Sequence, residues 1–452
     1  MLTTPVFTRL LTTVEYGQYN VFNSWLGIVT IIVSLNLSWG VYSQGLVKFE
    51  GDRNVFSSSL QGLSFSLIAI WTLVYLITHS FWNHVFNLTT VQMLAMLVMI
   101  WTTTVFGFWS TEQRVDFKYK SLVLITLLVS LAKPILGIVF VIMADDKVTA
   151  RILGLVLVEL VGYTGLFVAQ MKRGKRFFSA RYWKYALVFN LPLVPHYLSQ
   201  IVLSSADRIM ISNMIGDSEA GIYSLAYSLS SIMALFNTAL TQTISPWIYQ
   251  KIKSKRISDI EPVGYTSLLI IAGVNLMLML LAPEAVAIFA PKTYHEAIYV
   301  IPPIALSVFF MYSYDLFAKF AFYYEKTKLI MAASVVGAIL NVILNYVFIR
   351  IFGYMAAGYT TLACYIIYSF AHYNLMNRVC EEYCDGIKPY DTKKILAISI
   401  PFIAMGFIFL FTYNYPIIRY GIILVAVVAT VIKRRKIEEV VKSMMVLKKN
   451  RG

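Results

Sequence analysis

Charged residues inside long apolar segments are the side chains of this sequence best placed to do chemistry. Residues 184–212 carry a polar residue at every fourth position: His196, Gln200, Ser204, Arg208 and Ser212. This spacing puts them on one face of a helix. An arginine facing lipid at the bilayer centre costs at least about 2.5–3.5 kcal/mol, so we expect the stripe to face a cavity or another helix. Arg208 and Gln200 then either contact an anionic ligand or serve the structure, with Arg208 pairing with Asp207 or snorkelling.

A second charged pair lies within residues 297–323. Asp315 and Lys319 are four residues apart, with the acid before the base, which is the favourable order for a helical ion pair. One interpretation is a self-neutralised pair in a helix interface. The other is a cavity site in which Lys319 binds an anion and Asp315 binds a coupling proton or Na⁺.

A third candidate, Lys133, directly precedes Pro134 within residues 120–143. Proline leaves backbone groups that need partners, so Lys133 either satisfies carbonyls at a kink or lines a cavity. Glu159 is the best acidic partner in this half of the chain and a second ion-coupling candidate. Tyr223 and Tyr227 suit contact with sugars, although tyrosines and hydroxyls also hold helices together.

The elements that must position these residues are membrane helices. The 452-residue chain is 58% hydrophobic and only 13% charged, with a mean hydropathy of +0.69. Soluble domains carry about 25% charged residues. We therefore predict an all-α polytopic membrane protein, with thirteen segments that each suit a spanning helix: 19–42, 57–78, 90–110, 120–143, 150–171, 184–212, 219–247, 263–290, 297–323, 327–350, 354–377, 395–412 and 415–432.

The net charge of +15 is distributed unevenly over the predicted loops. Of the 38 Lys and Arg residues, 29 fall on one side, six on the other and three inside helices. The richer side should be cytoplasmic, and it includes the C-terminus. The basic charge thus indicates topology and attraction to membrane lipid, not nucleic acid.

Two similar strings indicate an internal repeat. EYGQY (15–19) aligns with EAGIY (219–223) at an offset of 204 residues, and each string begins a long helix. Chance similarity of two helix starts is the alternative. Parallel repeats are a known transporter architecture. The offset also places Arg208 over Thr4, so residues 1–11 are expected to be the remnant of a truncated first helix.

Three segments carry a family resemblance: TRLLTTVEYGQYN (8–20), SADRIMISNMIGDSEAGIYSLAY (205–227) and YYEKTKLIMAASVVGAILNVILNYVFIRIFGYMAAGYTTL (323–362). They resemble the bacterial polysaccharide flippases of the multidrug, oligosaccharidyl-lipid and polysaccharide exporter superfamily. The resemblance implies two six-helix lobes plus two C-terminal helices. The corresponding division is an N-terminal lobe (1–171), a basic linker (172–183), a C-terminal lobe (184–378), helices 13 and 14 (379–433) and a basic tail (434–452).

The resemblance also implies a function. Such proteins move undecaprenyl-pyrophosphate-linked oligosaccharides to the outer leaflet of the cytoplasmic membrane by alternating access around a central polar cavity. Arg9, in the TRLL string, is the one basic residue of the first helix that remains to line such a cavity. A polysaccharide polymerase is a candidate partner.

Two other functions compete with a flippase. A membrane polymerase or glycosyltransferase needs acid and base groups in outer loops, but the loop at Asp145 and Asp146 is short and these residues suit a helix cap. An ion-coupled drug exporter of the same superfamily is the second alternative, against which the intramembrane basic residues argue. We expect no enzyme activity and no cofactor. We also expect no metal site, because Cys380 and Cys384 lack nearby histidines.

Overall fold

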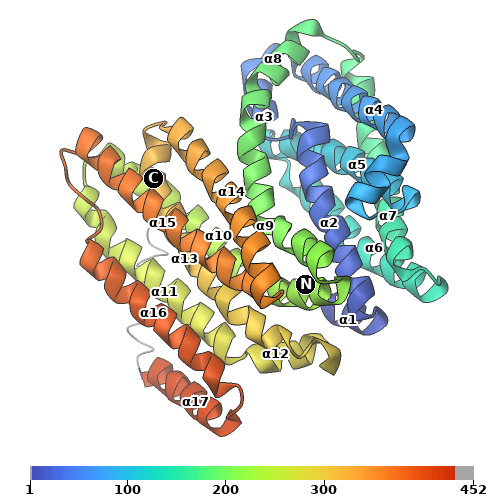
Figure 1. The fold of residues 1–452 in the computed structure, drawn as a ribbon. Coiled ribbons are helices and arrows are strands. Elements are labelled where there is room, and N and C mark those ends of the chain that lie inside the picture. The colour runs from blue at the N-terminus through green and yellow to red at the C-terminus, as the bar shows by residue number, and fades with distance from the viewer. Residues whose placement is uncertain (1–2, 433–452) are drawn as a thin grey trace. The chain divides into compact units, whose positions relative to one another are not determined.

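The computed structural model describes residues 3–432, which form seventeen α-helices and four 3-10 helices, with no strand in that range (Figure 1). The predicted all-α fold class is confirmed. The basic tail predicted at residues 434–452 lies outside the described residues.

Contacts within the chain define two compact units. Among the described residues, the first unit is Val6–Gly221, and the second comprises 222–432 together with 3–5. The helices up to residue 214 are α1 Thr4–Leu10, α2 Thr13–Ser34, α3 Val41–Lys48, α4 Arg53–Phe86, α5 Thr90–Val115, α6 Tyr119–Met143, α7 Lys147–Gly174, α8 Ala180–Asn190 and α9 Val194–Met214. Those that follow are α10 Asp217–Lys253, α11 Ile260–Leu280, α12 Ala282–Phe289, α13 Ala297–Tyr323, α14 Thr327–Phe352, α15 Ala356–Tyr383, α16 Thr392–Thr412 and α17 Pro416–Ile432. The lobe boundaries proposed from the sequence remain a prediction.

Nine helical spans in residues 3–432 are long and apolar enough to cross a bilayer. They comprise α4, α5, α6, α7, α8 with α9, α11, α13, α14 and α16. The other four predicted spans correspond to α2, α10 and α15, which are long but less apolar, and to α17, which has 17 residues. The chain is a multi-span membrane protein.

The first unit is built around α7, which packs against α4, α5 and α6. Phe22, Met96, Ile100 and Ile152 are fully buried in its core. The outer helix α6 has a mean hydropathy of 2.4, yet only 11% of its apolar span is buried within the protein. A helix that is apolar all round but barely covered by protein must face lipid.

The second unit is built around α13, 83% of whose apolar span is buried. Its main neighbours are α15, which runs beside it, and α11 (Figure 1). Phe309, Phe317 and Phe320 fill the space between these helices. Because α13 is enclosed on nearly every side, polar residues on it are held by protein and not by lipid.

Side chains cap the starts of four described helices, α2, α5, α7 and α16. Thr12 with Glu15 and Thr89 with Gln92 form reciprocal capping boxes at α2 and α5. The Asp146 carboxylate accepts a hydrogen bond of 3.0 Å from the Thr149 backbone N–H at the start of α7. The predicted capping role of the Asp145–Asp146 pair is thus confirmed for Asp146.

The two similar strings meet where α2 and α10 begin. A Cβ atom on Gly17 would lie 1.8 Å from the Asp217 carbonyl oxygen, and one on Gly221 would lie 2.2 Å from the Thr13 carbonyl oxygen. The offset of 204 residues maps Thr13 onto Asp217 and Gly17 onto Gly221, so the contact is reciprocal. Gln18 adds a hydrogen bond of 3.0 Å to the Asp217 carboxylate. Close backbone approach therefore explains the glycine in both strings.

Candidate functional site: buried charges in the membrane helices

A lysine, a glutamate and a threonine meet inside the first unit, and we call this group the first triad. Lys133 Nζ on α6 lies 2.5 Å from Glu159 Oε1 on α7. Thr102 on α5 donates a hydrogen bond of 2.5 Å to Glu159 Oε2. Glu159 and Thr102 are fully buried, whereas the Lys133 side chain keeps 29% of its surface exposed. The predicted pairing of Lys133 with Glu159 is confirmed.

The local sequence explains how the first triad forms. Pro134 lies inside α6, and the helix remains continuous from Tyr119 to Met143. The Lys133 ammonium reaches across to α7 and bonds a carboxylate there. A fully buried carboxylate needs both a counter-ion and a second donor, and Lys133 and Thr102 supply them.

A second triad of the same chemical composition lies in the second unit. Lys319 Nζ is 2.7 Å from Asp315 Oδ1 one turn earlier on α13. Thr241 on α10 donates a hydrogen bond of 2.8 Å to Asp315 Oδ2. Lys319 is buried, and the Asp315 side chain is 26% exposed. The spacing of four residues thus forms the predicted ion pair, and Thr241 completes it.

Aromatic rings surround the second triad. The Tyr314 ring lies 4.5 Å from that of Tyr368 and 5.4 Å from that of His372, between centroids. His372 is buried, and its ring nitrogens have no hydrogen-bond partner among the described residues. His372 is not among the predicted site residues, although a histidine within a predicted span was a visible signal.

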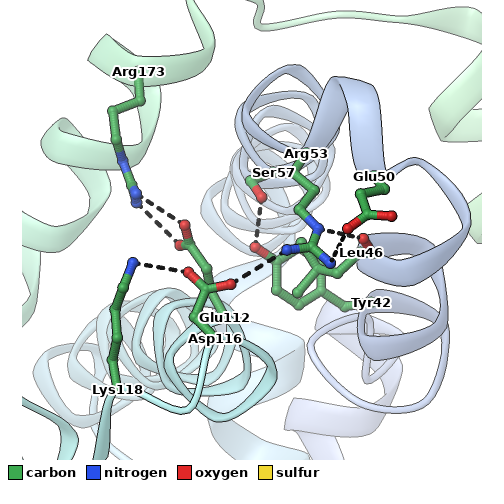
Figure 2. Close-up of polar contacts among 9 residues, drawn as sticks. All are labelled: Tyr42, Leu46, Glu50, Arg53, Ser57, Glu112, Asp116, Lys118 and Arg173. Carbon is green, nitrogen blue, oxygen red and sulfur yellow. Dashed lines mark hydrogen bonds and ion pairs between the residues drawn. The ribbon is translucent and has the colours of Figure 1, made fainter.

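A charged network joins one end of α4, α5 and α7 in the first unit (Figure 2). It comprises Glu50, Arg53, Glu112, Asp116, Lys118 and Arg173. Arg173 forms two parallel contacts with Glu112, of 2.9 and 3.0 Å, as Figure 2 shows. The Asp116 carboxylate forms ion pairs with Lys118, at 3.0 Å, and with Arg53, at 3.4 Å.

The network extends into the interior through amides. The Gln170 amide donates a hydrogen bond of 2.6 Å to the Glu112 carboxylate, and the Gln61 amide donates one of 2.6 Å to the Gln170 side-chain oxygen. The ion pairs border a polar pocket of about 490 Å³. Each cation here has a carboxylate partner on the same or a neighbouring segment, so the arrangement fastens helix ends together. This network was not predicted, because its members are far apart in the chain.

The other predicted site residues lie on three helices. Arg208 and Gln200 are half-buried on α9. Arg208 donates a hydrogen bond of 2.6 Å to the Ser204 carbonyl oxygen of its own helix. Arg9 is exposed on α1. Tyr223 is fully buried on α10, with its ring centroid 6.5 Å from that of Tyr227. Asp207 is also buried.

The structure therefore brings four of the nine predicted site residues together, as two ion pairs: Lys133 with Glu159 and Asp315 with Lys319. Tyr223 and Tyr227 are neighbours on one helix. The roles of all nine in binding or coupling stay predictions.

The fold has counterparts among solved structures. The fold is similar to that of an inward-closed structure titled lipid II flippase MurJ, at a TM-score of 0.68 and 15% identity, covering 96% of this chain and 98% of that one. An inward-facing multidrug resistance MATE family transporter of the MOP superfamily matches at a TM-score of 0.64 and 13% identity, over 84% of this chain and 94% of the other. The bent form of the Vibrio cholerae MATE transporter VcmN matches at a TM-score of 0.53 and 12% identity, over 86% and 100%.

The chain belongs to the polysaccharide biosynthesis protein family, whose model matches residues 1–252. A second model, MatE, matches residues 192–347. "Lsg locus putative protein 1" of Haemophilus influenzae is 26% identical over 211 residues, which are 44% of this chain and 51% of that protein. An "Uncharacterized membrane protein" of the same organism is 24% identical over 203 residues, covering 44% and 50%. The chain thus spans about half the length of the curated relatives it matches.

Proposed function

We propose that this protein flips undecaprenyl-pyrophosphate-linked oligosaccharide units from the inner to the outer leaflet of the bacterial cytoplasmic membrane, for surface polysaccharide synthesis. The observation that carries the proposal is the pair of triads, each of which holds a lysine ammonium among membrane helices. A diphosphate is anionic, and an ammonium inside a membrane protein is an expensive group kept for anions or coupling ions. Membership in the polysaccharide biosynthesis family supports the same substrate class.

In each triad, the binding of an ion to the carboxylate would change the state of the lysine. A lysine held by a carboxylate is neutralised as a pair, and either a proton or Na⁺ on Glu159 or Asp315 would release it. The released ammonium of Lys133 or Lys319 could then attract the diphosphate. In this scheme the carboxylates couple transport to an ion, and alternating access moves the substrate.

Arg208, Gln200, Arg9, Tyr223 and Tyr227 complete the proposed substrate contacts. Arg208 and Arg9 supply guanidinium groups for phosphate oxygens, and the tyrosines supply faces and hydroxyls for sugars. The C-terminus lies on the cytoplasmic side in this proposal, as the basic loops indicate.

The protein is proposed to have no enzyme activity. The structural neighbours are transporters and a flippase by their titles. In the outer loop that most resembled a paired-carboxylate site, Asp146 is engaged as a helix cap. A polysaccharide polymerase that receives the flipped unit is a proposed partner.

An ion-coupled multidrug exporter is the second candidate, favoured by the MatE match at residues 192–347. The two functions differ in their ligand charge. A cationic drug would be repelled by a released lysine, whereas an anionic diphosphate would be attracted.

The test is gene inactivation in the host, followed by an assay of lipid-linked oligosaccharide in each leaflet. We expect accumulation in the inner leaflet, rescued by the wild type and by the control Lys326→Gln, whose lysine pairs with Glu382 outside the triads, but poorly by Lys319→Gln. Normal outer-leaflet display in a null strain that lacks other flippases would refute the proposal and favour the exporter.

A further inference from the structure

A basic and aromatic surface groove lies along α8, and we call it the α8 groove. It has a volume of about 670 Å³ and is lined by Arg181, Lys184, Tyr185, Val188 and Phe189. These residues are three or four apart in pairs, so one helix face carries cations at its start and apolar side chains one to two turns later. The groove therefore changes from charged to apolar along the helix axis.

Arg181 in the groove and Lys48 beside it on α3 contact aromatic rings. Lys48 Nζ lies 4.8 Å from the Tyr185 ring centroid, and the Arg181 guanidinium carbon lies 5.2 Å from that of Phe49. Lys184 is exposed. Among the described residues, no carboxylate lies within 4 Å of Lys48, Arg181 or Lys184.

This absence of ion pairs sets the groove apart from the charged network at α4, α5 and α7. There, Arg53 and Arg173 are each paired with carboxylates. Near α8, the carboxylate of Asp52, the residue before α4, accepts a hydrogen bond of 3.0 Å from the Tyr182 hydroxyl of α8. Arg181 and Lys184 of the groove, and Lys48 beside it, thus form no ion pair among the described residues, so their charge is available to an anionic ligand.

The position of α8 along the chain places the groove at the membrane surface. It follows the basic segment KRGKRFFS (172–179) and opens the apolar span Ala180–Met214. Aromatic rings and basic side chains at such a boundary mark the interface between lipid headgroups and acyl chains. Phe177 and Phe178 are exposed just before α8.

We propose that the α8 groove binds an anionic phospholipid of the cytoplasmic leaflet. The phosphate lies between Lys48, Arg181 and Lys184, and an acyl chain lies against Val188 and Phe189. The apolar end of the groove argues against a free phosphate or a nucleic acid, because neither would cover Val188, which is 67% exposed. The site goes beyond the flippase proposal, because its ligand is a bulk membrane lipid and not the transported molecule.

The test is native mass spectrometry of the purified full-length protein titrated with phosphatidylglycerol or phosphatidylcholine. The variant is Arg181→Gln with Lys184→Gln. The charge-matched control is Lys120→Gln with Lys172→Gln, which removes two exposed lysines of the same unit outside the groove. A charge-keeping variant, Arg181→Lys with Lys184→Arg, separates loss of charge from loss of fold.

We expect the wild type to prefer phosphatidylglycerol and the glutamine variant to bind it about 30-fold more weakly, since each basic residue near anionic lipid contributes about 1 kcal/mol. The control and charge-keeping variants should stay within about threefold of the wild type, a change of less than 1 kcal/mol.

Three results would overturn the inference. The first is an equal weakening of phosphatidylglycerol binding in the groove variant and its control, which would mean that binding depends on the general surface charge. The second is equal binding of phosphatidylcholine. The third is full displacement by equimolar undecaprenyl diphosphate or by glycerol phosphate, which would assign the groove to the substrate or to free phosphate. The flippase proposal survives each of these results.

Discussion

The carboxylate in each of the two triads has two donors, and the pairing determines what a substitution does. Removing Lys133 leaves Glu159 as an uncompensated buried charge, whereas removing both leaves an apolar gap that neighbouring side chains can fill. Breaking one partner of a buried pair typically costs about 3–5 kcal/mol, and replacing both can be neutral.

We therefore expect Lys133→Met to lower the free energy of unfolding by about 3–5 kcal/mol, and Lys133→Met with Glu159→Leu to recover most of that loss. Thermal denaturation in detergent measures both. Equal destabilisation by the single and double variants would show that the pair does not act as a unit.

The threonine of the first triad gives a second prediction. Thr102→Val removes a hydrogen bond to a charged group and should cost about 1.5–3 kcal/mol. The matched control is Thr104→Val, because Thr104 is also buried on α5 but bonds only the Ile100 carbonyl of its own helix. Comparable losses in the two variants would contradict the role of Thr102 in holding Glu159.

The contacts of the two triads differ in how far the sequence could predict them. Asp315 and Lys319 are four apart on one helix, so their pairing follows from helix geometry. Thr102 and Thr241 lie 57 and 74 residues from the carboxylates they bond, and no local pattern indicates such contacts. The hydroxyl partners depend on packing between helices, which a sequence alone leaves open.

At the scale of elements, the starts of α2 and α10 are held by a close backbone approach. Any side chain at Gly17 or Gly221 would collide with a carbonyl oxygen of the facing helix. Gly17→Ala should therefore lower the free energy of unfolding by about 1–3 kcal/mol, as overpacking does.

The control for this change is Gly165→Ala on α7, where a Cβ atom meets nothing within 4 Å. That substitution should be neutral or stabilising by up to about 1 kcal/mol, because alanine favours helix. Thermal denaturation of the two variants side by side checks the prediction, and a stable Gly17→Ala protein would refute it.

The elements were largely predictable because apolar length alone identifies a membrane helix. All thirteen predicted segments overlap helices of the structure. The split of residues 184–212 into α8 and α9, at Leu191–Leu193, was not predicted, although Pro192 and Pro195 were visible breakers. The charged network escaped prediction, because its ion pairs join residues that only the packing of helices brings together.

At the scale of the whole molecule, the distribution of basic residues predicts which ends of the helices face the cytoplasm. The three native cysteines are buried, so exposed cysteines can be introduced against a low background. Asp145→Cys should react with a membrane-impermeant thiol reagent in intact cells. Lys120→Cys should react only after permeabilisation, and the reverse pattern would overturn the predicted topology.

The central claim is that the protein moves an anionic lipid-linked oligosaccharide across a membrane. The most direct test is reconstitution of the purified protein into liposomes that carry fluorescent undecaprenyl-pyrophosphate-linked oligosaccharide, with an impermeant quencher added outside. We expect fast leaflet exchange with the wild type and an unchanged rate with Lys326→Gln. Lys133→Gln with Lys319→Gln should reduce the rate at least about tenfold, which corresponds to a rise of about 1.4 kcal/mol in the activation free energy. Exchange no faster than in protein-free liposomes, across imposed H⁺ and Na⁺ gradients of either direction, would contradict the central claim.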